Sequence, residues 1–76
     1  MPCIRPDGSL TLAARDVMSA MSQPRPLDEI RELSRQPLYR VRASLRELGD
    51  AGLVEAHDER WVLTEAGRTA LAEAGA

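Results

Sequence analysis

Apolar residues recur at steps of three and four over the first third of the chain. The spacing links Leu10, Ala13, Ala14, Val17, Met18 and Met21. Residues at these steps share one face of an α-helix, so the pattern predicts a first helix with Ser9 or Thr11 as its N-terminal cap. Pro24 and Pro26 end it, because proline lacks a backbone N–H and restricts the residue before it. Only a very short edge strand fits at that point.

Two further helices are predicted with a gap of only a few residues between them. The first of the two is short, has acidic residues near its positive N-terminus and ends near Ser34. Its expected buried residues are Leu27, Ile30 and Leu33. Because so short a gap allows only a sharp turn between helices packed at a large angle, the pair is predicted to form a helix-turn-helix.

The third predicted helix opens at Gln36 and Pro37 and spans about residues 37–51. Proline suits the first helical position, where its missing N–H removes no hydrogen bond. The expected buried stripe consists of Leu38, Val41, Leu45 and Leu48. Gly52 ends the helix, since glycine adopts the left-handed conformation without a steric penalty.

Beyond Gly52, apolar residues recur at every second position instead of at every third or fourth. Residues 53–57 and 60–63 are predicted strands, joined by a hairpin turn within the sequence HDER. Trp61 and Leu63 lie on one face of this hairpin, with Trp61 covering the core. Thr64 then caps a last helix, whose expected inner face is Ala66, Ala70 and Leu71.

These elements predict an α+β fold that is mostly α, with a three-helix core, a two-stranded hairpin and a C-terminal helix. A chain of 76 residues suits a single core. We expect residues 1–8 to be a flexible N-terminus and residues 9–76 to be the domain. Cys3, the only cysteine, then lies in the flexible part, where its thiol has no expected role.

Composition narrows the class of protein. With 43% hydrophobic and 29% charged residues, the chain is typical of a globular protein. It lacks the apolar segment of a signal peptide, and no run approaches the roughly 18 apolar residues of a membrane span, so we expect a cytoplasmic protein without a membrane partner. One cysteine and the single His57 provide no spacing for a metal site.

Charge is unevenly distributed along the chain. The net charge of −2 argues weakly against a nucleic-acid partner. Residues 25–46, however, hold six Arg against three acids, whereas residues 47–76 hold two Arg against seven acids. Within the basic block, residues 35–46 contain four Arg and no acid. This local excess of positive charge requires an explanation.

Two stretches carry a resemblance to a known family: LDEIRELSRQPLYRVRASL, and LRELGDAGLVE followed by WVLTEAG. Together they resemble the winged helix-turn-helix domain of bacterial transcription regulators such as the MarR-like, PadR-like and ArsR-like proteins, over about residues 11–71. The resemblance implies that the third helix enters the major groove of double-stranded DNA. It also implies that the hairpin, the wing, reaches the backbone or minor groove, with Gly52 as the joint between the two.

The candidate DNA-binding residues follow from the helical period. If Val41 marks the buried direction, steps of about 100° place the opposite face at Gln36, Tyr39, Ala43 and Arg46, flanked by Arg40 and Arg42. Arg35 completes the basic cluster, and Arg60 is the candidate on the wing. The planar guanidinium binds guanine or phosphate in a bidentate manner. The alternative is a solvated face whose arginines pair with Glu47, Asp50 or acids of the preceding helix.

The wing contact is the weaker part of this hypothesis. Asp58 and Glu59 stand beside Arg60 and repel phosphates, whereas regulators of the resembled class carry basic wings. A polar turn without a binding role explains these residues equally well.

The sequence bears on three classes of function. The first is sequence-specific DNA binding by a small regulator, which implies a homodimer on two half-sites, with the first and last helices, including Leu71, as the available surfaces. The alternative is a protein–protein interaction module that uses the acidic C-terminal third. An enzyme is the poorest fit, because no nucleophile pairs with a base and there is no glycine-rich phosphate loop. No cofactor is expected, and no feature identifies a small-molecule effector.

Overall fold

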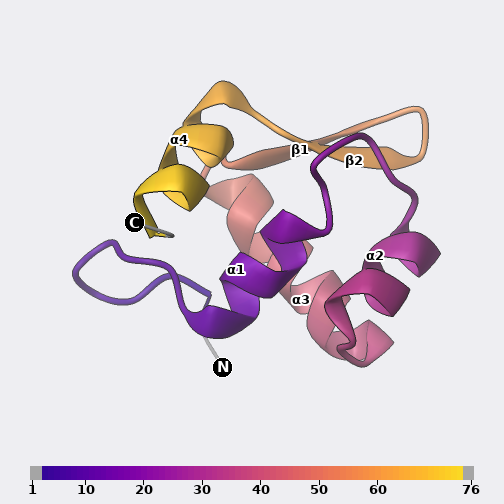
Figure 1. The fold of residues 1–76 in the computed structure, drawn as a ribbon, viewed down its shortest axis with the longest axis horizontal. Helices are drawn as coiled ribbons and strands as arrows, with labels where there is room; N and C mark the ends of the chain where they lie inside the picture. Colours follow the sequence, from indigo (N-terminus) through magenta and orange to yellow (C-terminus); the bar gives the residue numbers. More distant parts are fainter. Residues whose placement is uncertain (1–2, 75–76) are drawn as a thin grey trace.

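The computed structural model describes residues 3–74 and contains four helices and one hairpin. The elements are α1 (Leu12–Ser19), α2 (Leu27–Ser34), α3 (Leu38–Asp50), β1 (Val54–His57), β2 (Arg60–Leu63) and α4 (Glu65–Ala74). Helices α1, α2 and α3 pack against one another, the hairpin lies along one side of them, and α4 returns to pack on α1 (Figure 1). The fold is therefore α+β and mostly helical, as predicted. No helix among residues 3–74 is long and apolar enough to cross a bilayer.

Helix α1 begins at Leu12 because Thr11 caps it. The Thr11 hydroxyl accepts a hydrogen bond from the backbone N–H of Ala14 at 3.3 Å and donates one to the carbonyl of Cys3 at 3.2 Å. Ser9, the other candidate cap, instead bonds the carboxylate of Asp7 through its N–H and its hydroxyl. Thr11 thus starts the helix and also holds the N-terminal segment beside it.

The predicted short edge strand is a single residue, Arg25. Its N–H donates to the carbonyl of Trp61 at 3.1 Å, and the N–H of Trp61 donates back at 2.7 Å. These two bonds join the loop between α1 and α2 to β2. The hairpin is therefore held to the helices through its backbone as well as through its side chains.

The turn between α2 and α3 is formed by Arg35, which adopts a left-handed conformation with φ 59°. Its N–H bonds the carbonyls of Arg31 and Glu32 and so closes the end of α2. Helix α3 begins at Leu38, with Pro37 as its N-cap and not as its first helical residue. The sharp turn is as predicted, and the helix starts one residue later.

Two leucines predicted to be buried beside this turn are exposed. Leu33 is 54% exposed and Leu38 is 38% exposed. In α2 the buried line runs from Ile30 to Ser34, four residues on, which leaves Leu33 at the edge of the helix contact. In α3 the buried residues are Val41, Ser44, Leu45 and Leu48. Small serines thus replace leucine where the helices come close.

The N-terminal segment belongs to the core, contrary to the expectation for Cys3. Cys3 is 3% exposed and packs in the same cluster as Met18, Met21 and Ile30. The Glu47 carboxylate accepts hydrogen bonds from the N–H groups of Cys3 and Ile4 at 2.7 and 3.0 Å. Burial raises the pKa of the Cys3 thiol, although a hydrogen bond with Ser44 opposes the shift. The core therefore includes a residue from the segment that was placed outside the domain.

The hairpin has the predicted turn. Asp58 and Glu59 form a two-residue loop with φ values of 50° and 64°, the positive pair that matches the twist of a tight hairpin. Val54 pairs with Leu63 and His57 pairs with Arg60. Gly52, with φ 78°, adopts the predicted left-handed conformation between α3 and β1.

Thr64 connects the end of the hairpin to the joint after α3. Its hydroxyl donates to the carbonyl of Gly52 at 2.7 Å and accepts from the N–H of Gly67 at 3.0 Å. Its own N–H donates to the carbonyl of Leu53 at 3.0 Å. The predicted cap of α4 is thus confirmed, and the same residue closes the base of the hairpin.

Helix α4 turns two of its three predicted residues inward. Ala70 and Leu71 are partly buried against the core as expected, whereas Ala66 is exposed and the neighbouring Gly67 is buried. The reason is the close approach of Gly67 to the backbone of Leu53, which leaves no room for a side chain there. That contact sets the rotation of α4.

The two helical glycines provide a matched test of this contact. In Gly67→Ala the new Cβ collides with the Leu53 carbonyl, so we expect a loss of about 1–3 kcal/mol in the free energy of unfolding. In Gly49→Ala the nearest atom lies 3.9 Å away. Alanine there should stabilise the helix by about 0.5–1 kcal/mol. Urea unfolding of both variants measures the difference, and equal effects at the two positions would contradict the close packing of α4.

Candidate functional site

Helix α3 presents one exposed face whose side chains include two arginines. Tyr39, Arg42, Ala43 and Arg46 are exposed, with Tyr39 69% exposed. Steps of three or four residues connect them, which places them on one side of the helix. Val41, Leu45 and Leu48 on the opposite side are buried. Arg40 is partly buried at the flank, as the helical period predicts.

The arginines on and beside α3 have no carboxylate partner within residues 3–74. The two ion pairs in that range are Arg25–Glu29 and His57–Glu55. Glu47, an expected partner, is directed to the backbone of the N-terminal segment. Asp50 lies one turn beyond Arg46 without pairing to it. The arginine side chains are therefore not neutralised by the acids named in the alternative explanation.

The arrangement of Arg42 and Arg46 slightly opposes folding. They lie four residues apart, so their charges are neighbours on the helix surface, and like charges at this spacing destabilise a helix by about 0.2–0.5 kcal/mol. Neither arginine forms an ion pair within residues 3–74 that would hold the two charges in place. An anionic partner would remove the repulsion.

Gln36 is placed apart from this face. Its side-chain nitrogen donates to the carbonyl of Ala13 in α1 at 3.0 Å. Its Oε1 atom is buried and has no hydrogen-bond partner within residues 3–74. Gln36 thus connects the turn before α3 to α1, which differs from the predicted contact with DNA. Arg35 is exposed at the same turn.

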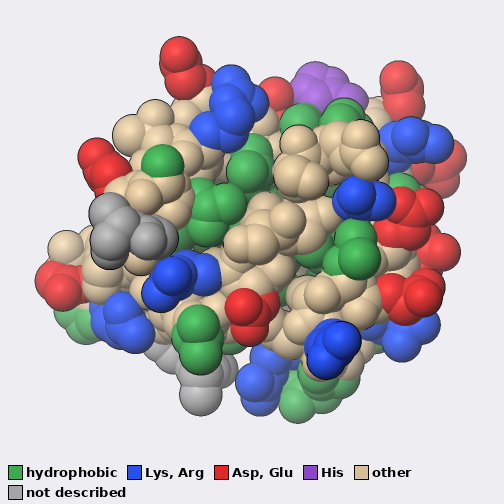
Figure 2. Space-filling view, in the orientation of Figure 1, with side chains coloured by type: hydrophobic (Ala, Val, Ile, Leu, Met, Phe, Trp, Pro, Cys, Tyr) green, Lys and Arg blue, Asp and Glu red, His purple; other side chains and the backbone are tan. Residues whose placement is uncertain are grey.

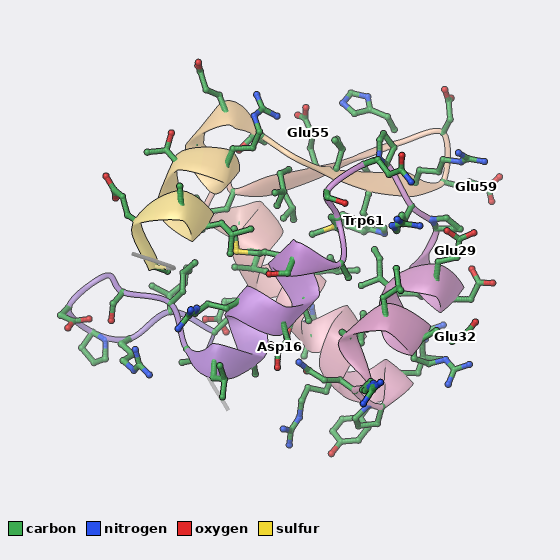
Figure 3. The ribbon with its side chains drawn as sticks, viewed as in Figure 1. Asp16, Glu29, Glu32, Glu55, Glu59 and Trp61 are labelled. Carbon is green, nitrogen blue, oxygen red and sulfur yellow. The ribbon has the colours of Figure 1, made fainter. Side chains whose placement is uncertain are left out.

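Arg60 lies on a different face of the molecule from Arg42 and Arg46. Alternation along β2 places Trp61 and the buried Leu63 toward the helices, so Arg60 lies with Val62 on the outer face. That face also carries the ion pair between His57 Nε2 and Glu55 Oε1 at 3.0 Å. In Figure 3, Glu55 points away from the helices and Glu59 lies at the hairpin tip. Asp58 and Glu59, the acids predicted to weaken the wing, form the turn directly before Arg60.

Acidic side chains also mark the side of α2. Figure 2 shows them along the edge formed by α2 and the hairpin tip, with arginines among them. Figure 3 places Glu29 and Glu32 there, on the outer side of α2. Glu29 pairs with Arg25 at 3.3 Å. This edge of the molecule therefore carries charges of both signs (Figure 2).

One feature beside this face is not evident in the sequence. Leu27, Leu45 and Trp61 line a mostly apolar groove of about 350 Å³, together with the side chains of Arg42 and Arg46. It forms because the bridge between Arg25 and Trp61 brings β2 next to the start of α2. The helical period locates the arginines but cannot locate Trp61 beside them.

Within residues 3–74 no group of three or more His, Cys, Asp or Glu side chains is placed to hold a metal ion. Comparisons of the chain with protein families, with curated proteins and with solved structures find no match. The geometry of α3 and its surroundings is therefore the basis for assigning a function.

The exposed face of α3 should be dispensable for folding. Arg42→Gln removes the repulsion with Arg46 and breaks no ion pair, so the free energy of unfolding should stay within about 0.5 kcal/mol of the original value or rise. Glu47→Gln removes the charged acceptor of two backbone N–H groups and should cost about 1–2 kcal/mol. Urea unfolding measures both, and a larger loss for Arg42→Gln would show that this side chain serves the fold.

Proposed function

We propose that this chain is a small bacterial transcriptional regulator, or its DNA-binding part, with a winged helix-turn-helix fold that binds double-stranded DNA without catalysis. In this proposal α2 and α3 form the helix-turn-helix, the hairpin is the wing, and α3 enters the major groove. The order of elements and the sharp turn at Arg35 support it. So do the sequences that resemble this family, LDEIRELSRQPLYRVRASL and WVLTEAG.

The observation that carries the proposal is the set of unpaired arginines on the exposed face of α3. Arg42 and Arg46 lie about 6 Å apart along the helix axis, given a rise of 1.5 Å per residue. Each guanidinium presents a planar fork of donors that matches guanine or a phosphate. Ala43, between them, leaves room for the helix to approach base edges. Tyr39, near the start of the helix, supplies a hydroxyl for a phosphate or a base.

The joint after α3 supports a fixed angle between the helix and the wing. Thr64 bonds the Gly52 carbonyl from the other end of the hairpin, and Arg25 bonds Trp61 on its far edge. A wing held at both places approaches DNA as one body with α3. We assign it a minor share of the affinity, because Asp58 and Glu59 accompany Arg60.

We also propose a homodimer. A single module of this size buries about 600–1,000 Å² against DNA, and useful specificity normally needs two half-sites. Helices α1 and α4, the surfaces expected from the sequence, pack on each other within the chain. Leu71 is partly buried in that contact, whereas Leu12, at the start of α1, is 65% exposed. Leu12 is thus the apolar side chain on these helices that is most available to a second copy.

Duplex binding in a salt series tests the proposal. Contacts from arginine to phosphate give a log-log slope of about −0.9 for each phosphate neutralised. The double variant Arg42→Ala and Arg46→Ala should bind the duplex at least tenfold more weakly, because each lost contact usually costs about 1–3 kcal/mol. It should also make the dependence of affinity on salt less steep. Fluorescence anisotropy of a labelled duplex measures both quantities.

The control is Arg15→Ala, which removes the same charge from the α1 surface that faces α4. This variant should keep the duplex affinity close to the original value. Unchanged affinity in the double variant would reject DNA binding through α3. The alternative of a protein-interaction module would then be favoured by the exposed acids of the hairpin, Glu55, Asp58 and Glu59.

A further inference from the structure

The groove beside α3 combines apolar residues with two arginines. Leu45, only 2% exposed, forms its floor, and the partly exposed Leu27 and Trp61 form its walls. Arg42 and Arg46 complete the lining mainly through the apolar stems of their side chains, and both residues are exposed. Its volume of about 350 Å³ is at the low end of ligand sites. It suits one large apolar side chain better than an extended ligand.

The two arginines specify the chemistry of an occupant. Their Cα atoms are separated by about 6 Å along α3, and two positive charges need two carboxylates to be neutralised. A small monocarboxylic acid supplies only one. A peptide with acidic residues on both sides of an apolar one supplies two carboxylates together with the anchor.

We propose that this groove binds an acidic peptide segment of a partner protein through one large apolar side chain flanked by carboxylates. The anchor packs against Trp61, Leu27 and Leu45, and the carboxylates pair with Arg42 and Arg46. Buried apolar anchors dominate the affinity of such contacts, while the charges set orientation and the rate of encounter.

The same two arginines are assigned to DNA, so the two partners exclude each other. This part rests on the proposed function. Carboxylates bound at Arg42 and Arg46 occupy the donors that a phosphate or guanine would use. A protein that presents such a segment therefore acts as an antagonist of DNA binding.

Trp61 is the only tryptophan and therefore reports on the groove directly. The probe is a capped synthetic peptide with one phenylalanine between pairs of glutamates. We expect a saturable change in tryptophan emission at micromolar to millimolar peptide. Replacing the phenylalanine by alanine, or the glutamates by glutamine, should weaken binding about tenfold or more. No change in emission, or equal binding of the alanine peptide, would overturn the proposal.

Two variants separate the groove from the DNA-binding face. Leu27→Ser removes a wall and should weaken the peptide about tenfold while leaving duplex affinity within about twofold. Arg46→Gln should weaken the binding of both the peptide and the duplex, and this substitution leaves the core residues unchanged. Circular dichroism checks that each variant is folded. Equal peptide affinity in both variants and the original protein would place the peptide elsewhere.

Competition completes the test. The peptide should displace a labelled duplex, and a complex that holds both partners would overturn their exclusion. If no duplex binds the original protein, the proposed function is rejected. The emission titration would still show whether the peptide binds in the groove.

Tighter binding of phenylacetate than of the peptide would reassign the groove to small acids. Emission that changes with protein concentration alone would assign it to a second copy, and either result overturns the peptide proposal.

Discussion

The inner side of α3 is the constraint on which the rest of the structure depends. Val41, Leu45 and Leu48 are buried, and α1, α2 and β1 all pack against the helix. At its C-terminal half, Glu47 binds the backbone of Cys3 and Ile4. Because these contacts come from several directions, α3 cannot rotate about its axis without breaking the core. The direction of its exposed face is therefore fixed by packing.

The packing of α3 also directs the charge of Glu47. Glu47 stands next to Arg46 in the sequence, but its carboxylate serves two backbone N–H groups more than 40 residues away. Its charge is thereby directed inward, away from the face that carries Tyr39, Arg42 and Arg46. A carboxylate with this role stabilises the N-terminal segment and leaves the arginines free for a partner. Folding and the proposed binding thus use opposite sides of one helix.

Much of the fold was predictable from the period of apolar residues and from the residues that start and stop helices. Thr11, Gly52 and Thr64 act as expected, and the hairpin has the predicted turn, because each of these depends on local backbone preferences. The errors occur where distant segments meet. The burial of Cys3 and the rotation of α4 depend on contacts with Glu47 and Leu53, which no local pattern contains.

The candidate site shows the same division. The helical period correctly places Tyr39, Arg42 and Arg46 together on an exposed face, since that follows from geometry within one helix. It cannot foresee that Gln36 bonds α1, or that Trp61 lies beside the two arginines, because both depend on packing between elements. Leu33 and Leu38 illustrate the same limit, since Leu33 lies in the last turn of α2 and Leu38 begins α3.

The most direct measurement is the change in backbone amide chemical shifts when a duplex of random sequence is added to the isotope-labelled protein. Our account predicts the largest shifts along the exposed face of α3, between Tyr39 and Arg46, with smaller ones at the hairpin turn. Shifts confined to α4 and the outer face of the hairpin, or no shifts at low salt, would contradict it.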